Sequence, residues 1–207
     1  MPIESPTLYG QAPDSAPVAL LLIDVINDFR FEDADRLRER ANPIAEKLAV
    51  LKRRFDDAEL PVIYCNDNFG RWRSNFDEIV EYCRSDKSNG QDIVDLLTPS
   101  DSDYAVLKAK ESGFHETNLA VLLKHLGVER LVIGGFTTDI CVLLTAMDAY
   151  LRDYDIIVPE DGATTIQPEH HAQALEYARR VLGAGVKPVD ELHPAEMAQK
   201  SGAASGT

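Results

Sequence analysis

Three side chains that can together perform nucleophilic chemistry each stand at or just after the end of a short apolar run: Asp24, Lys108 and Cys141. Cys141 falls in the first turn of a predicted helix, where backbone amides and the helix dipole favour a thiolate. Lys108 would favour the same anion by its charge. Asp24 could accept the thiol proton and later return it to a leaving amine. The trio therefore predicts a nucleophilic site built from a carboxylate, an ammonium and a thiol.

Each member of the trio also has a simpler structural interpretation. A cysteine in a buried helix commonly serves as a small core residue. An acidic residue after a first strand is often a cap or a metal ligand, and a lysine at a strand end is usually solvated. Position alone leaves these alternatives open.

The elements that must bring the trio together alternate between strands and helices. Apolar runs at 18–23, 61–65, 104–107, 131–133, 156–158 and 186–189 read as strands, and Pro188 restricts the last to a sheet edge. Helices are expected from Asn42 and Pro43 onward, over 119–126 with a stop at Gly127, over 139–150 as a buried helix, and from Pro168 to about 182. This pattern predicts an α/β fold: a single-domain, Rossmann-like parallel sheet of about six strands with helices on both faces. The carboxyl ends of parallel strands meet at one edge, so the trio can converge there.

Length, composition and charge narrow the class of protein. The chain has 207 residues, which favours one domain, over 17–193; 1–16 would form a loosely ordered arm and 194–207 a disordered tail. The formal net charge is −14, so we expect no nucleic-acid and no membrane partner. Three cysteines without CxxC spacing disfavour a disulfide framework or a zinc cluster, and Cys65 and Cys83 are interpreted as structural. A cytoplasmic protein acting on a small molecule is expected.

Several motifs of cofactor and serine chemistry are missing. The chain contains no GxGxxG, no GxxxxGK[ST] and no GxSxG. His170 and His171 are adjacent in a predicted helix and would point in different directions, so we do not expect them to share a metal ion. The prediction is that no metal and no cofactor is required.

Three blocks together resemble the isochorismatase-like cysteine hydrolases, the superfamily that includes nicotinamidases and N-carbamoylsarcosine amidohydrolases. They are LLIDVINDF at 21–29, LKAKESGF at 107–114 and GGFTTDICV at 134–142, within a resemblance over about 17–192. It implies an Asp-Lys-Cys triad formed by Asp24, Lys108 and Cys141; Lys108 rather than Lys110 keeps the four-residue step to Ser112. The resemblance also implies a cis peptide between Phe136 and Thr137, and an oxyanion hole made by the Thr137 and Cys141 amides.

The resemblance points to hydrolysis of a C–N bond in an amide, ureido or carbamoyl compound through a thioester. The metal-binding Asp-x-His of nicotinamidases has no counterpart in YCNDNFG at 64–70, which disfavours nicotinamide. Two rival functions remain: a non-catalytic binding protein, and a hydrolase of other activated carbonyl compounds.

Substrate and subunit contacts are less defined by the sequence. Arg71 or Arg73 could bind a substrate carboxylate, or simply be solvated. The candidate pocket residues are Phe29, Asn68, Arg71, Trp72, Arg73 and Phe114, and any of the aromatic ones could instead belong to the core. The family commonly forms a homodimer or homotetramer, which we expect here.

Overall fold

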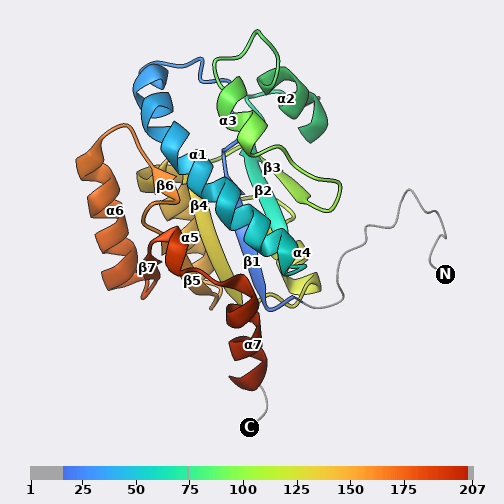
Figure 1. Cartoon of the computed structure of the whole chain (residues 1–207), viewed down its shortest axis with the longest axis vertical. Helices are drawn as coiled ribbons and strands as arrows, with labels where there is room; N and C mark the ends of the chain where they lie inside the picture. The colour runs from blue at the N-terminus through green and yellow to red at the C-terminus, as the bar shows by residue number, and fades with distance from the viewer. Residues whose placement is uncertain (1–15, 74, 205–207) are drawn as a thin grey trace, which may run out of the picture.

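The computed structural model describes residues 16–73 and 75–204, and within them seven parallel strands form one central sheet with helices on both sides (Figure 1). The strands are β1 (Val18–Ile23), β2 (Val62–Asp67), β3 (Tyr104–Lys108), β4 (Arg130–Phe136), β5 (Asp155–Pro159), β6 (Ala163–Thr164) and β7 (Gly185–Lys187). Their order is β3-β2-β1-β4-β5-β7, and β6 pairs with β4. The predicted α/β fold is confirmed, and β7 lies at an edge as Pro188 requires. The extra strand is β6, which is too short to leave an apolar run.

Seven α-helices surround the sheet in the described part of the chain. They are α1 (Ala34–Asp57), α2 (Phe76–Cys83), α3 (Gln91–Leu96), α4 (Leu119–His125), α5 (Leu143–Tyr150), α6 (Pro168–Val181) and α7 (Pro194–Ala204). A π-helical turn, η1 (Thr138–Val142), leads into α5, and a 3-10 turn, η2 (Val189–Glu191), follows β7. None of the described helices has the length and apolarity needed to cross a membrane.

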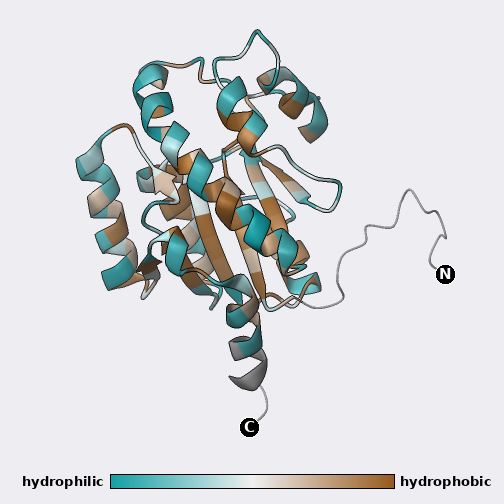
Figure 2. Cartoon of the chain, viewed as in Figure 1, coloured by the Kyte–Doolittle hydropathy of each residue, from teal (hydrophilic) through white to brown (hydrophobic). Residues whose placement is uncertain are grey.

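The side chains of β1 alternate between two apolar clusters. Leu20 and Leu22 pack with α1, α2 and α3 on one face, whereas Leu21 and Ile23 pack with α4, α5 and α6 on the other. Every β1 residue is fully buried, and the strands are the most apolar part of the molecule (Figure 2). Burial on both faces is why the strand reads as a continuous apolar run.

Strand β1 lies in the middle of the sheet, and later strands were added on both of its sides. Strands β2 and β3 extend the sheet one way, and β4, β5 and β7 extend it the other, so the strand order reverses between β1 and β4. Ligands of such sheets bind beyond the strand ends at this switch point. β1 and β4 approach closely there: Gly135 pairs with Ile23 at φ +121°, and a Cβ on Gly135 would lie 2.1 Å from the Ile23 carbonyl oxygen.

The predicted start of the first helix is wrong. Helix α1 begins at Ala34, and Pro43 lies inside it rather than at its first turn. Leu37 and Ala41 continue the buried face upstream of Pro43. Their burial offsets the intrahelical hydrogen bond that Pro43 cannot donate.

The predicted burial of the segment 139–150 on all sides is also wrong. Thr145, Ala146 and Ala149 are buried, but Ile140 and Tyr150 are about half exposed. Apolar composition reports which residues prefer burial. It does not report whether other elements of the same chain pack over those residues.

The tail prediction fails over most of its length. Residues 194–204 form α7, in which Met197 and Ala198 pack against the cluster that contains α1, and the Met197 carbonyl accepts a hydrogen bond from Arg130. Residues 205–207 lie outside the described residues, as do 1–15 of the predicted arm. Ala16, which the predicted arm included, is buried, and its N–H donates to Leu126 O at 2.7 Å.

Candidate active site

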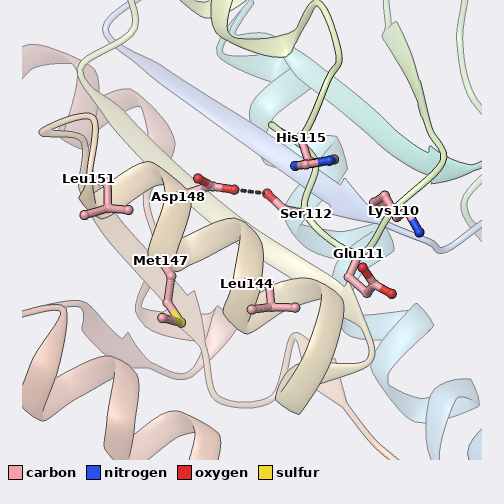
Figure 3. Close-up of a pocket in the computed structure, with 8 residues that line it drawn as sticks. All are labelled: Lys110, Glu111, Ser112, His115, Leu144, Met147, Asp148 and Leu151. Atoms are coloured by element: carbon pink, nitrogen blue, oxygen red, sulfur yellow. Dashed lines mark hydrogen bonds between the residues drawn. The ribbon is translucent and has the colours of Figure 1, made fainter.

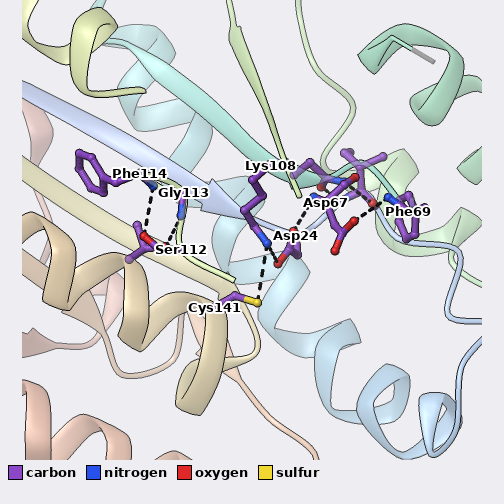
Figure 4. A network of polar contacts seen from close by, with 11 residues as sticks. Asp24, Asp67, Phe69, Lys108, Ser112, Gly113, Phe114 and Cys141 are labelled. Atoms are coloured by element: carbon purple, nitrogen blue, oxygen red, sulfur yellow. Dashed lines mark hydrogen bonds and ion pairs between the residues drawn. The ribbon is translucent and has the colours of Figure 1, made fainter. Parts of the chain in front are cut away.

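Asp24, Lys108 and Cys141 meet at the carboxyl edge of the sheet (Figure 4). Lys108 Nζ lies 2.8 Å from Asp24 Oδ2 and 3.8 Å from Cys141 Sγ. Asp24 follows β1, Lys108 ends β3, and Cys141 belongs to the η1 turn after β4. The structure thus brings together all three residues that the sequence proposed as a nucleophilic site, with the ammonium in reach of both potential anions.

The backbone at Asp24 is specialised for this placement. Asp24 has φ +52°, in the left-handed region that aspartate tolerates better than most residues. Its N–H donates to Cys65 O at 3.1 Å, and its Oδ1 accepts the Asp67 N–H at 2.7 Å. The two bonds to β2 fix both the backbone and the carboxylate, and leave Oδ2 for Lys108.

Asn66 is a contributor that the sequence reasoning missed. It is fully buried in β2, and its Oδ1 accepts the Ile26 N–H at 3.0 Å while its Nδ2 donates to Ile26 O at 2.9 Å. This pair of bonds satisfies the backbone of the segment that follows Asp24. An amide at the end of the apolar run 61–65 was the available signal.

The surroundings of Cys141 favour the neutral form of its thiol. Burial, the largest cause, and the Asp24 carboxylate together raise the pKa of Cys141 to about 12, although the Lys108 ammonium opposes them. Desolvation and the Asp24 carboxylate therefore outweigh the attraction of Lys108, one of the groups that the sequence indicated would favour a thiolate. The resting side chain is a neutral thiol.

Asp24 and Lys108 form a buried ion pair. Burial raises the pKa of Asp24 above its ordinary value, although Lys108 and the hydrogen bonds from Cys141 and the Asp67 amide lower it. Burial disfavours the charge on Lys108, but the Asp24 carboxylate and Cys141 raise the Lys108 pKa. A carboxylate with a raised pKa is a stronger base than one in water, which suits it to accept a thiol proton.

The η1 turn sets the direction of the backbone next to Cys141. The Phe136–Thr137 peptide bond is cis, where the resemblance puts one. A hydrogen bond from the Thr137 N–H to the Cys141 side chain lowers the thiol pKa, so this amide is aimed at the sulfur. The Thr137 carbonyl accepts the Val142 N–H at 3.1 Å.

The proposed pocket residues on the β1 and β2 loops lie in different environments. Phe29 is buried, with its ring centroid 6.2 Å from that of Phe136. Asn68 is buried and its Oδ1 accepts the Gly70 N–H at 2.8 Å. The Arg71 guanidinium lies over the Tyr82 ring, 5.0 Å from its centroid.

The remaining pocket candidates lie away from the trio or in solvent. Trp72 is 80% exposed and Arg73 is exposed. Phe114 belongs to the buried cluster of α4, α5 and α6, with its ring 6.1 Å from Tyr154, so it is a core residue.

The segment after Lys108 borders a separate hollow of about 490 Å³ (Figure 3). Ser112 Oγ donates to the Asp148 carboxylate of α5, and the Gly113 N–H donates to Thr145 Oγ1 at 3.0 Å. These bonds tie the loop after β3 to the helix that follows Cys141. No member of the trio lines the hollow.

No three or more His, Cys, Asp and Glu residues form a group that could hold a metal ion within 16–73 and 75–204. The Asp67 carboxylate, at the end of β2, accepts the Phe69 N–H at 2.6 Å.

Comparison with known families agrees with the geometry. Residues 18–190 match the isochorismatase domain family. The chain belongs to this family. It is 36% identical over 177 residues to the uncharacterized isochorismatase family protein YaaI of Bacillus subtilis, covering 86% of this chain and 97% of that protein.

Two further relatives have amidohydrolase names. N-carbamoylsarcosine amidase from Thermoplasma acidophilum has a solved structure that is 31% identical, with a TM-score of 0.60, covering 84% of this chain and 98% of that one. The ureidoacrylate amidohydrolase RutB of Pantoea ananatis is 36% identical over 86 residues, which span 42% of this chain and 34% of that protein. The chain is an isochorismatase-family hydrolase, and members of its family act on amides and carbamoyl compounds.

Proposed function

We propose that the chain is a cysteine hydrolase that cleaves the C–N bond of a small amide, ureido or carbamoyl compound. The observation that carries the proposal is the position of the Lys108 ammonium, 2.8 Å from Asp24 and 3.8 Å from Cys141. A carboxylate, an ammonium and a thiol in mutual contact are the parts of a nucleophilic site. The amidohydrolase names of relatives support the choice of substrate.

Asp24 carries the proton in both halves of the proposed reaction. Asp24 takes the proton of Cys141, and the sulfur forms a bond to the carbonyl carbon. The Thr137 and Cys141 amides donate to the oxyanion, a contribution of about 3 kcal/mol per donor in such sites. The C–N bond then breaks, and the amine leaves with the proton that Asp24 held. Water attacks the thioester, gives its proton to Asp24, and restores the thiol as the acid product departs.

The substrate class follows from what the site lacks and from its relatives. Asn66, Asp67 and Asn68 occupy the segment after Cys65, where nicotinamidases carry a metal-binding histidine. Ureido and carbamoyl acids are therefore the preferred candidates over nicotinamide. Arg71 and Arg73 are the candidate partners for a substrate carboxylate on this loop.

The test is ammonia release from a panel of ureido acids, carbamoyl acids and nicotinamide, with intact-protein mass spectrometry after rapid acid quenching. We expect turnover of at least one ureido or carbamoyl acid and an acyl adduct on Cys141. Cys141→Ala should abolish both, whereas Cys83→Ala, a buried cysteine outside the site, should retain both. Ligand binding without turnover would support a non-catalytic protein. Hydrolysis without ammonia or amine release would indicate another activated carbonyl substrate.

A further inference from the structure

Two adjacent histidines of α6 contact two adjacent residues of the η1 turn. His171 Nδ1 lies 2.9 Å from Thr138 Oγ1, and His170 Nδ1 lies 3.5 Å from Asp139 Oδ2. Thr138 is buried, with 2% of its surface exposed, and it directly follows the Thr137 amide that points at the sulfur. Neither histidine has a part in the proposed reaction, so these contacts need a separate explanation.

The hydrogen bonds of His171 determine its tautomer. Its Nε2 lies 3.1 Å from the carbonyl oxygen of Glu160, which can only accept, so Nε2 carries the proton. In the neutral ring Nδ1 is then an acceptor, and the Thr138 hydroxyl donates to it. The ring therefore links η1 to the segment after β5 through two directed bonds.

The anchor at the other end of this link is itself held. The Glu160 N–H donates to Lys187 O of β7 at 3.0 Å, and the Gly135 N–H of β4 donates to Gly162 O at 2.9 Å. The segment 160–162 is thus bonded to the sheet on both sides of β5. A side chain fixed to this segment can hold the start of η1 in place.

We infer that His171 is a positioning residue, which, by accepting the Thr138 hydroxyl, holds the Thr137 amide in the orientation that stabilises the oxyanion. The effect of His171 on catalysis rests on the proposed function. Its effect on the orientation of the Thr137 amide does not. Burial lowers the pKa of His171, which favours the neutral form that the geometry requires. The charged groups around the ring are Arg40 of α1, Asp139 of η1 and Glu160, and the adjacent residue His170 is on α6.

The first arm of the test measures turnover. Thr138→Val replaces the hydroxyl with a methyl group of similar size, and we expect kcat to fall about 10- to 100-fold, since small misplacements of reacting groups cost this much. KM should change less than threefold. Thr138→Ser should restore kcat to within about threefold. His171→Gln should resemble Thr138→Val, whereas His170→Gln, the control on the adjacent and more exposed ring, should not.

The second arm needs no substrate. In ¹⁵N NMR spectra of the parent protein, His171 should show a protonated Nε2 and an unprotonated Nδ1, and Thr138→Val should shift the Thr137 and Cys141 amide resonances while Thr138→Ser returns them. An Nδ1–H tautomer, or amide resonances that ignore Thr138→Val, would overturn the inference even if turnover were never found. Unchanged kcat in Thr138→Val with an active parent would also overturn it. Failure of the parent to hydrolyse any amide, with the NMR results as expected, would overturn only the proposed function.

Discussion

Asp24→Asn should make Cys141 more reactive toward alkylation while abolishing turnover. The Asp24 carboxylate raises the pKa of Cys141, and it does so more strongly than the Lys108 ammonium lowers it. With a pKa of about 12, only about 10⁻⁴ of the thiol is ionised at pH 8. Removing the carboxylate leaves the thiol facing Lys108 alone.

The distance between Lys108 and Cys141 gives the size of the effect. Two unit charges 3.8 Å apart interact with about 4 kcal/mol at an effective dielectric constant of 20, a factor of about 10³ in the thiolate fraction. The carboxylate must offset at least this much in the parent. Solvent around the partly exposed sulfur reduces the gain, so we expect alkylation of Cys141 to accelerate between about 10- and 1000-fold.

The assay is iodoacetamide labelling of each cysteine between pH 6 and pH 10, followed by peptide mass spectrometry. Cys83, whose pKa burial raises to about 12 as well, is an internal control that should not respond. Asp67→Asn removes a neighbouring carboxylate that acts on Lys108 rather than on Cys141, and it should leave Cys141 labelling near the parent rate. Slower or unchanged labelling of Cys141 in Asp24→Asn would refute the electrostatic reasoning.

Four other outcomes follow from the structure. Lys108→Met leaves a buried carboxylate unpaired and should lower the free energy of unfolding by about 3–5 kcal/mol, or Tm by about 6–20 °C. Arg84→Met breaks an exposed pair of the same 2.8 Å length with Asp95 and should lower it by at most about 1 kcal/mol. Calorimetry of the two variants measures the difference. Gly135→Ala places a Cβ 2.1 Å from the Ile23 carbonyl oxygen and should prevent accumulation of folded protein. Gly183 has φ +64° with open space around it, so Gly183→Ala should lower the free energy of unfolding, measured by urea titration, by only about 1–2 kcal/mol. Because the pKa of His171 is lowered in the folded protein, the unfolded chain binds the His171 proton more tightly. The free energy of unfolding should therefore fall as the pH drops below about 6.5, and His171→Gln should flatten this dependence. A pH dependence that the substitution leaves unchanged would contradict this prediction. The exposed Ile140, Leu144 and Leu151 lead us to expect a homodimer or homotetramer, so sedimentation equilibrium should find a mass above 22.9 kDa, which Leu151→Asp lowers.

The sequence predicted that these three side chains converge because strand ends are local features. Asp24, Lys108 and Cys141 each stand beside an apolar run, and parallel topology carries the ends of such runs to one edge. The adjacent histidines, which the sequence predicted would point in different directions, contact two adjacent residues of the η1 turn, His170 with Asp139 and His171 with Thr138.

What the sequence could not predict depends on contacts between distant segments. The role of Asn66 depends on pairing with Ile26, 40 residues away, and nothing near Asn66 reports that partner. The ionisation of Cys141 depends on how completely other elements exclude water from it. The helical position of Cys141 indicated groups that favour a thiolate, but it did not report how much burial opposes that charge.

The proton transfer from Cys141 to Asp24 would leave the net charge of this buried site unchanged. Before transfer the site holds a carboxylate, an ammonium and a neutral thiol; after it, a neutral acid, an ammonium and a thiolate. The net charge is zero in both states, so no new charge has to be created in a desolvated place. Lys108 Nζ needs only to exchange an anion at 2.8 Å for one at 3.8 Å, which it can do without leaving its buried position at the end of β3. In the reaction we propose, Cys141 therefore stays protonated until its proton moves to Asp24, and Lys108 stabilises the thiolate that this transfer forms.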